Sequence, residues 1–198
     1  LIQTAPKHLF RDAGSTEAQC GGEAGRLSIL QDDRHRIAEL RRFLVRSLHL
    51  ACASSEPRVS IIVPIYNAYE YTVDCLESVA RNTDVPYQLV LINDGSPDAR
   101  ISALLSALDG AHSDLLIINR AKNLGFVHTV NQGFELSSPL DVVILNSDTV
   151  VTQGWLNKIA RFGRSDSGIA TITPLTNAGT LASVPDFLRD GTLPPHLD

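Results

Sequence analysis

The chain of 198 residues contains no methionine, one tryptophan and three cysteines. Cys20, Cys52 and Cys75 are too widely spaced to form a metal-binding motif, and their odd number is atypical of a disulfide-stabilised domain. Few, scattered cysteines are typical of reduced cytoplasmic proteins. Because the chain begins at Leu1 and has no methionine, we expect it to be part of a longer protein.

The chain also lacks long apolar runs and an excess of basic residues. Its apolar runs are much shorter than the roughly 20 residues that cross a bilayer, and it has no signal-peptide pattern. We therefore expect a cytoplasmic protein, for which peripheral association with a membrane remains open. The formal net charge of −5 argues against a nucleic-acid partner, because proteins that bind nucleic acid neutralise phosphates with clustered Lys and Arg.

Residues 1–56 differ in pattern from the rest of the chain. Residues 1–26 carry Pro6, a Gly-Gly pair and no hydrophobic period, which predicts a loop or linker. From Leu27 to about Ala53, apolar residues recur at three- and four-residue steps opposite an arginine-rich face, which predicts an amphipathic helix. Such a face either binds a membrane or partner or, more commonly, is solvated on a helix packed against the main domain. We expect a boundary near residue 56, between this extension and the domain formed by residues 57–198.

The following hundred residues alternate between short apolar runs and amphipathic segments. Strands are expected at residues 59–63, 88–92, 114–118, 142–145 and 169–172, and helices at 69–82, 96–108, 126–136 and 154–162. Ser96 is expected to cap the second of these helices, with Pro97 in its first turn. Strands that are apolar throughout and alternate with helices predict an α/β fold whose parallel sheet is covered on both faces.

Each of the first four predicted strands ends in polar residues. Because the carboxyl ends of parallel strands lie at one edge of the sheet, where α/β proteins bind ligands, these residues are expected to form a site. The ring of Tyr66 can lie against a base, and the Asp94 carboxylate can accept a hydrogen bond from a base or a ribose. Gly95 allows close approach of backbone, and Ser96 precedes a helix with unpaired amides. Taken singly, Asn93-Asp94-Gly95 is also a common turn, and Tyr66 is also suited to the core.

The fourth of these strands delivers Asp148 to the same edge, after the polar residues Asn146 and Ser147. Mg²⁺ and Mn²⁺ bind a few protein oxygens and keep other coordination positions for water and phosphate, so Asp148 is a candidate metal ligand. The alternative is that Asp148-Thr149 only turns the chain out of the strand.

Five sequence motifs follow one another between Arg58 and Pro185. They are Val59-Ser-Ile-Ile-Val-Pro-Ile-Tyr-Asn67, Cys75-Leu-Glu-Ser-Val79, Val90-Leu-Ile-Asn-Asp-Gly-Ser96, Asn123-Leu-Gly-Phe126 leading to Asn131-Gln-Gly133, and Ile144-Leu-Asn-Ser-Asp-Thr149 before Gly154-Trp-Leu156. In this order they resemble the donor-binding half of family 2 glycosyltransferases of the GT-A fold. The segment Thr173–Gly179 is similar to bacterial members that build surface polysaccharides.

The resemblance implies transfer of a sugar, with inversion, from a nucleotide-diphosphate sugar to a glycan or lipid-linked acceptor, assisted by Mg²⁺ or Mn²⁺. It implies that Asp148 binds the metal and Asp94 the base. The other residues implied to bind the nucleotide sugar are Pro64, Tyr66, Asn67, Gly95, Ser96, Asn123, Gly125, Asn131 and Asn146. One departure is Asn146, a neutral residue where the family often has aspartate, which implies a modest affinity for metal.

The resemblance also implies that the acceptor half, which carries the general base, lies beyond this chain. Asp186 and Asp190 are weak candidates for that base within it. Arg120 and Lys122 are candidate counter-charges for a diphosphate, whereas His128 and His112 are more simply explained without a catalytic role. Two alternatives are a nucleotide-sugar-binding module without turnover and a nucleotidyltransferase, which would be expected to have a glycine-rich, basic loop after its first strand.

Overall fold

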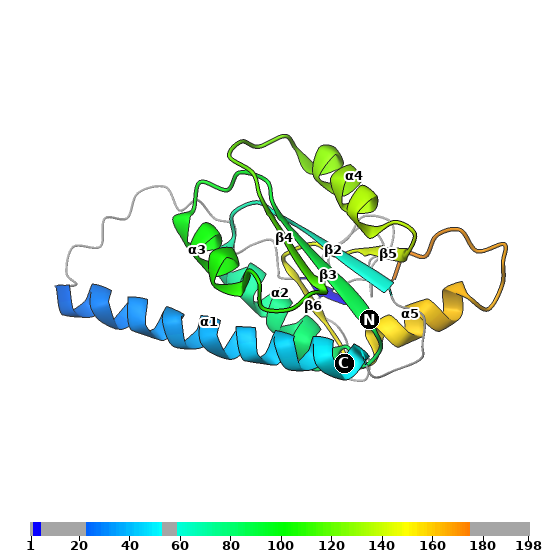
Figure 1. Cartoon of the computed structure of the whole chain (residues 1–198), viewed down its shortest axis with the longest axis horizontal. Coiled ribbons are helices and arrows are strands. Elements are labelled where there is room, and N and C mark those ends of the chain that lie inside the picture. Colours follow the sequence, from blue (N-terminus) through cyan, green and yellow to red (C-terminus); the bar gives the residue numbers. More distant parts are fainter. Residues whose placement is uncertain (1, 5–22, 53–58, 175–198) are drawn as a thin grey trace.

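The computed structural model describes residues 2–4, 23–52 and 59–174 of the chain (Figure 1). The strands are β1 (Ile2–Thr4), β2 (Val59–Ile65), β3 (Tyr87–Asn93), β4 (Leu115–Asn119), β5 (Asp141–Ile144) and β6 (Thr149–Val151). The helices are α1 (Glu23–Cys52), α2 (Tyr69–Asn82), α3 (Ala99–Leu108), α4 (Phe126–Ser137) and α5 (Trp155–Gly163). No helix in the described part of the chain is both long enough and apolar enough to cross a membrane.

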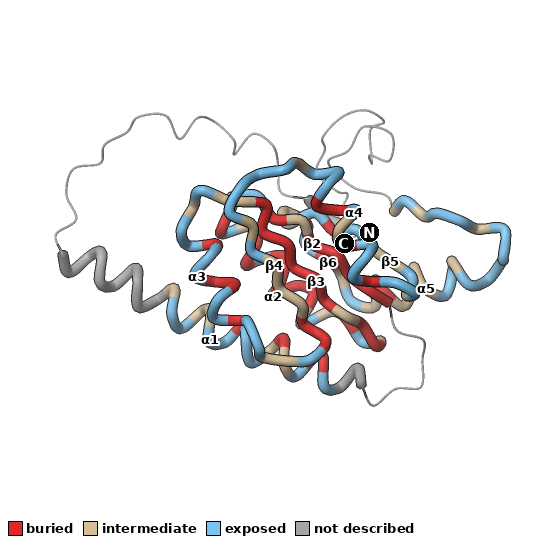
Figure 2. The backbone as a smooth tube through the Cα atoms, turned by 45° about the horizontal axis from the view of Figure 1, so that its top comes forward, coloured by how far each residue is buried: buried red, intermediate tan, exposed pale blue. Residues whose placement is uncertain are grey.

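Strands β2 to β5 form a parallel sheet in the order β4-β3-β2-β5, which confirms the expected fold class. The central strands β2 and β3 are buried almost throughout, as the tube in Figure 2 shows in red. In contrast, β5 lies at an edge of the sheet, and Ile144 is 43% exposed. The strand expected at residues 142–145 in a sheet covered on both faces is therefore not fully buried, because within the described residues β5 pairs on one side only.

Helices cover both faces of the sheet. Helix α4 lies on one face, where Gly133 packs so closely on β2 that a Cβ atom there would lie 2.5 Å from the Ile62 side chain. Helices α1, α2 and α3 lie on the opposite face, with α1 outermost beneath the other two (Figure 1). The main hydrophobic core fills the space between these three helices and the sheet.

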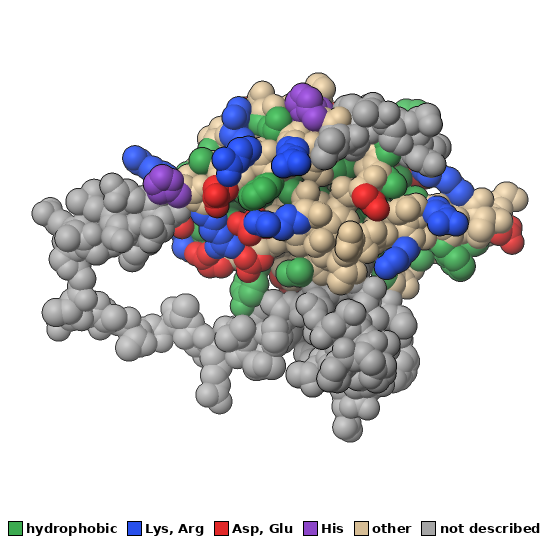
Figure 3. Space-filling view, turned by 90° about the horizontal axis from the view of Figure 1, so that it is seen from below, with side chains coloured by type: hydrophobic (Ala, Val, Ile, Leu, Met, Phe, Trp, Pro, Cys, Tyr) green, Lys and Arg blue, Asp and Glu red, His purple; other side chains and the backbone are tan. Residues whose placement is uncertain are grey.

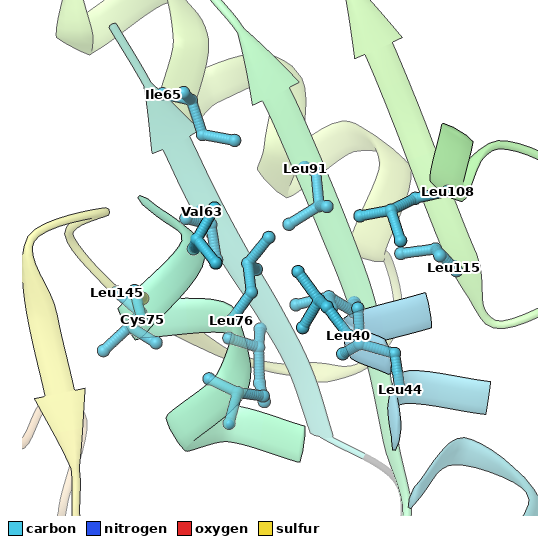
Figure 4. Packing of buried hydrophobic residues seen from close by; sticks show 14 of the residues in the cluster. Leu40, Leu44, Val63, Ile65, Cys75, Leu76, Leu91, Leu108, Leu115 and Leu145 are labelled. Atoms are coloured by element: carbon cyan, nitrogen blue, oxygen red, sulfur yellow. The ribbon is translucent and has the colours of Figure 1, made fainter. Parts of the chain in front are cut away.

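Helix α1 contributes directly to this core. Leu40, Leu44 and Leu48 are completely buried, and Figure 4 shows the first two beside side chains from α2 and the sheet. The guanidinium of Arg36 adds ion pairs to three acidic side chains of α2, at Glu70, Asp74 and Glu77. Burial of leucines at four-residue spacing fixes which face of α1 points to solvent.

Three further expectations are wrong. Residues 2–4 were expected in a loop but form β1, which pairs antiparallel with β6. Asp98, rather than Ser96, caps α3, because the Asp98 carboxylate accepts the Arg100 N–H while the Ser96 hydroxyl is bound elsewhere. Residues 169–172 have no regular structure, because this apolar run forms no strand pairing within the described residues.

Candidate functional site

The loops after β2 and β3 are joined by hydrogen bonds at the carboxyl edge of the sheet. The Asn67 N–H donates to the Ser96 hydroxyl over 2.9 Å, and the Asp94 N–H donates to the Ile65 carbonyl over 2.9 Å. Asn67 and Ala68 adopt positive φ angles of 59° and 57°, which are uncommon for residues other than glycine. The hydrogen bonds of Asn67 hold this local strain, which is a frequent feature of functional loops.

Asn93 connects the ends of β3 and β4. Its side-chain oxygen accepts the Ser96 N–H over 2.9 Å, and its amide nitrogen donates to the Asn119 side chain over 3.1 Å. Asn93 is only 2% exposed, so both of its polar groups need partners. The amide thus shapes the turn at residues 94–96 and aligns the two strand ends.

Asp94 is the centre of the network. Its carboxylate accepts the Leu124 N–H over 3.0 Å, the Gly125 N–H over 2.8 Å and the Arg120 guanidinium over 2.9 Å. Burial alone raises the pKa of the Asp94 carboxyl, but these hydrogen bonds and the positive charge of Arg120 outweigh it, so that the pKa lies below its ordinary value. Asp94 is therefore held ionised, and it fixes the loop that leads into α4.

Arg120 uses its whole guanidinium within this network. An arginine has five N–H donors, and those of Arg120 form hydrogen bonds to Asp94, Thr129, the His128 carbonyl and, twice, the Gln132 side chain. Its side chain is 14% exposed. Because these donors are engaged within the protein, they primarily hold the loop after β4 against α4, and a role of Arg120 as counter-charge for a diphosphate stays a prediction.

Gly95 lies against the loop between β4 and α4. It adopts a φ of +68°, and a Cβ atom there would lie 2.6 Å from the Asn123 backbone nitrogen. Gly125 also has a positive φ, and its N–H is shared between Asp94 and the Asn123 side chain. Glycine at position 95 therefore allows two segments of the protein's own backbone to meet.

Asp148 lies in the turn between β5 and β6. Asp148 is partly exposed, and within the described residues its carboxylate accepts no hydrogen bond and forms no ion pair. It lies near α2: burial raises the pKa of the Cys75 thiol to about 12, and the negative charge of Asp148 contributes to the rise. The Cys75 thiol also donates to the Asn146 carbonyl over 3.6 Å. Asp148 is thus a carboxylate held beside a packed helix yet available to a ligand.

The other candidate residues differ in how closely they join the network. Contacts connect Asn67, Asp94, Gly95, Ser96, Asn123 and Gly125. Pro64 is partly buried in β2, whereas Tyr66, Asn131 and Asn146 are exposed, with Tyr66 at 51%. His128 and Lys122 are also exposed, and His112 precedes β4 at the opposite edge of the sheet. Asp186 and Asp190 lie outside the described residues.

Sequence reasoning missed Thr129 and Gln132 as members of the network. A signal for them was present, because residues three apart lie on one face of a helix. Thr129 and Gln132 lie in the same turn of α4 as Gly133, the buried glycine that packs on β2. Their side chains are therefore on the side of α4 that faces the sheet and Arg120.

Few of the described side chains are placed to coordinate a metal ion. Within the described residues, no group of three or more His, Cys, Asp or Glu side chains is close enough to hold an ion. A single carboxylate at Asp148 fits only a hard cation such as Mg²⁺ or Mn²⁺ that takes its other ligands from phosphate and water.

The chain is similar to glycosyltransferases over most of its described length. The family model for glycosyl transferase family 2 matches residues 60–177. An uncharacterized glycosyltransferase of Haemophilus influenzae is 32% identical over 108 residues, which are 54% of this chain and 32% of that protein. A teichoic acid poly(glycerol phosphate) polymerase of Staphylococcus epidermidis is 28% identical over 120 residues, 60% of this chain and 17% of that protein. The chain thus spans about a third or less of the length of these relatives.

A solved structure supports the fold. The mannosyltransferase PcManGT of Pyrobaculum calidifontis, in complex with GDP-Man and Mn²⁺, superposes with a TM-score of 0.50 at 21% sequence identity. The superposition covers 72% of this chain and 42% of that one. At this identity the likeness establishes the arrangement of the sheet and helices.

Replacement of Asp94 by asparagine is expected to lower the free energy of unfolding at neutral pH by about 3–5 kcal/mol, because the buried Arg120 loses its counter-charge. Because the pKa of Asp94 is lower in the folded than in the unfolded protein, ionised Asp94 stabilises the folded protein above about pH 4. This stabilisation is lost as the pH falls through the pKa that Asp94 has in the folded protein. The difference between wild type and variant should therefore narrow only below about pH 4 in urea denaturation.

Asp109→Asn is the matched control, because Asp109 is exposed. It should shift the unfolding midpoint little at any pH. A difference between wild type and Asp94→Asn that stays constant from neutral to acidic pH would contradict the proposed ion pair.

Gly95→Ala is expected to destabilise the protein more than Gly110→Ala. Both glycines have nearly the same φ, +68° and +67°, but a Cβ atom meets the loop backbone only at position 95. Gly110→Ala should cost about 1–2 kcal/mol from the left-handed backbone alone, and Gly95→Ala about 1–3 kcal/mol more from the clash. Equal losses in chemical denaturation would show that the contact of residue 95 with the loop is unimportant.

Proposed function

The chain belongs to glycosyl transferase family 2, and we propose that it is the donor-binding half of an enzyme that transfers a sugar from a nucleotide-diphosphate sugar to a glycan or lipid-linked acceptor with inversion. The observation that carries this proposal is the available carboxylate of Asp148, beside strand ends that are tied together by the Asp94 network. The name of the Haemophilus influenzae relative supports sugar transfer in general, and that of the teichoic acid polymerase supports a polymeric acceptor.

In this proposal the nucleoside lies at the ends of β2 and β3. The exposed ring of Tyr66 stacks on the base, and the strained Asn67 backbone positions the ribose. Among the described residues, the Oδ2 atom of Asp94 receives one hydrogen bond, from the Gly125 N–H, and its second acceptor direction can accept from the base. Its larger contribution is to hold Asn123 and Gly125, which shape the wall of the donor pocket.

Asp148 is the proposed ligand of Mg²⁺ or Mn²⁺. When bound, such a cation neutralises the negative charge that grows on the departing nucleoside diphosphate. The structure of the mannosyltransferase, which contains GDP-Man and Mn²⁺, supports this choice of metal. Asn146 is too weak a ligand to replace a second carboxylate, but its exposed side chain can bind the ribose or a water molecule. Lys122, which is exposed on the loop after β4, can add positive charge near the phosphates.

Inversion requires the acceptor hydroxyl to attack the anomeric carbon from the face opposite the departing diphosphate. The C–O bond to the diphosphate breaks as the new glycosidic bond forms, and a general base receives the hydroxyl proton. We assign this base to the acceptor half of the longer protein, because the chain spans only about a third or less of its relatives. The same observation favours a second candidate: by itself, this chain binds a nucleotide sugar without turnover.

Asp148→Asn is expected to reduce Mn²⁺-dependent binding of a nucleoside diphosphate at least tenfold, because the substitution removes the charged ligand. Titration calorimetry of the variant with UDP and with GDP, each in the presence and absence of Mn²⁺, measures the effect. The free energy of unfolding should stay within about 0.5 kcal/mol of the wild type, because the carboxylate has no partner among the described residues.

The matched control is Asp141→Asn, at the start of β5, the strand that precedes the turn with Asp148. Asp141 is exposed and pairs with Arg164, and its substitution removes the same charge. If both variants bind with wild-type affinity, or if both lose affinity equally, Asp148 is not the metal ligand.

A further inference from the structure

The outward face of α1 is strongly basic although the whole chain is acidic. Between residues 33 and 49, the exposed charged side chains of α1 are four arginines (Arg34, Arg41, Arg42 and Arg46) and one glutamate, Glu39. The formal net charge of the chain is −5, so positive charge is concentrated on this face against the overall balance. Figure 3, which views the molecule from the side where α1 lies, shows blue basic side chains on this face together with red acidic ones.

These arginines are not needed to hold the fold. In contrast to Arg36, which is bound by three carboxylates of α2, Arg41 and Arg46 form no ion pair or hydrogen bond in the described part of the chain. Arg42 pairs with Glu39 over 3.4 Å, but both side chains are more than 60% exposed, so that this pair contributes little. The apolar side of the helix is already buried in the core, which keeps the arginines turned outward.

Two shallow grooves run along this helix and share Arg46. One, of about 460 Å³, is lined by Ala38, Arg41, Arg42, Val45, Arg46 and His49. The other, of about 400 Å³, lies between α1 and the end of α2 and is lined by Phe43, Arg81 and one acidic residue, Asp84, among others. The Arg81 guanidinium lies 4.5 Å from the Phe43 ring centroid. The basic face therefore continues from α1 onto α2. We call the surface formed by Arg41, Arg42, Arg46 and Arg81 the α1 basic face.

We propose that the α1 basic face docks on an anionic membrane surface. Charge complementarity carries this choice, because acidic headgroups attract clustered arginines without needing an apolar anchor. A protein partner would need a well-packed apolar or aromatic centre. On the α1 basic face the larger apolar side chains, Phe43 and Val45, are half-buried within the protein itself.

The arrangement of the helices and the sheet is compatible with binding of a nucleotide sugar by a protein that is docked on a membrane through α1. Helix α1 lies beneath α2 and α3, on the side of the sheet opposite α4 (Figure 1). A membrane in contact with α1 would therefore not cover α4. It would also leave uncovered the Asp94 network, which lies in the loops before α4. The α1 basic face is formed by residues of α1 and α2 alone. Membrane docking through this face therefore does not depend on the proposed sugar-transfer function.

The test is co-sedimentation of the full chain with vesicles. The protein should bind vesicles of phosphatidylcholine mixed with phosphatidylglycerol, dissociate at high salt, and not bind vesicles of phosphatidylcholine alone. Arg41→Gln with Arg46→Gln should lower partitioning into the anionic vesicles about 25-fold, since each arginine near the surface contributes about a fivefold gain.

The control is Lys158→Gln with Arg161→Gln, which removes two positive charges from exposed positions of α5. It should leave partitioning nearly unchanged, and circular dichroism should show that both double variants remain folded. Absence of binding to anionic vesicles, equal loss in the two double variants, or equal binding to neutral vesicles would each overturn the proposal.

Discussion

The site depends on one buried ion pair, between Asp94 and Arg120. Neither charge is stable in the interior alone, so each must be matched by the other and by hydrogen bonds. Asp94 satisfies this constraint with two amides of the loop before α4, and Arg120 satisfies it with groups on α4 itself. The pair thereby ties the ends of β3 and β4 to the start of α4. The backbone in this region is therefore positioned by internal charge matching and hydrogen bonds.

The two faces of the sheet differ in the size of the apolar cluster that each buries. The face covered by α1, α2 and α3 holds most of the buried apolar residues and provides stability. The smaller cluster around Ile62, Val90 and Ile92 lies on the α4 face. The candidate site lies at the carboxyl edge of the sheet, where the Asp94 network adjoins α4 and Asp148 lies near α2. The exposed Ile144 and Phe162, at 43% and 61%, show that apolar surface also remains on β5 and α5.

Local patterns predicted most of the fold. Helix α2 begins and ends at the expected residues, and the parallel strands appear within one or two residues of their expected positions, because periodicity encodes them directly. The β1–β6 pairing was not predictable from pattern, since it joins segments far apart in the chain. Ser96 and Asp98 are both good cap residues, and the choice between them depends on Asn67, which takes the Ser96 hydroxyl. The sequence indicated a role for Asp94. Its pairing with Arg120 was not predictable, because it depends on how the loops after β3 and β4 meet in space.

The most direct test of this account is titration calorimetry of the unmodified chain with UDP, dTDP and GDP, each with and without Mn²⁺. The account requires a single nucleoside-binding edge in which Asp148 is available to a cation. It predicts that at least one nucleoside diphosphate binds with one-to-one stoichiometry and that Mn²⁺ strengthens its binding. Absence of binding by all three nucleotides in the presence of Mn²⁺ would contradict a donor site formed by these residues.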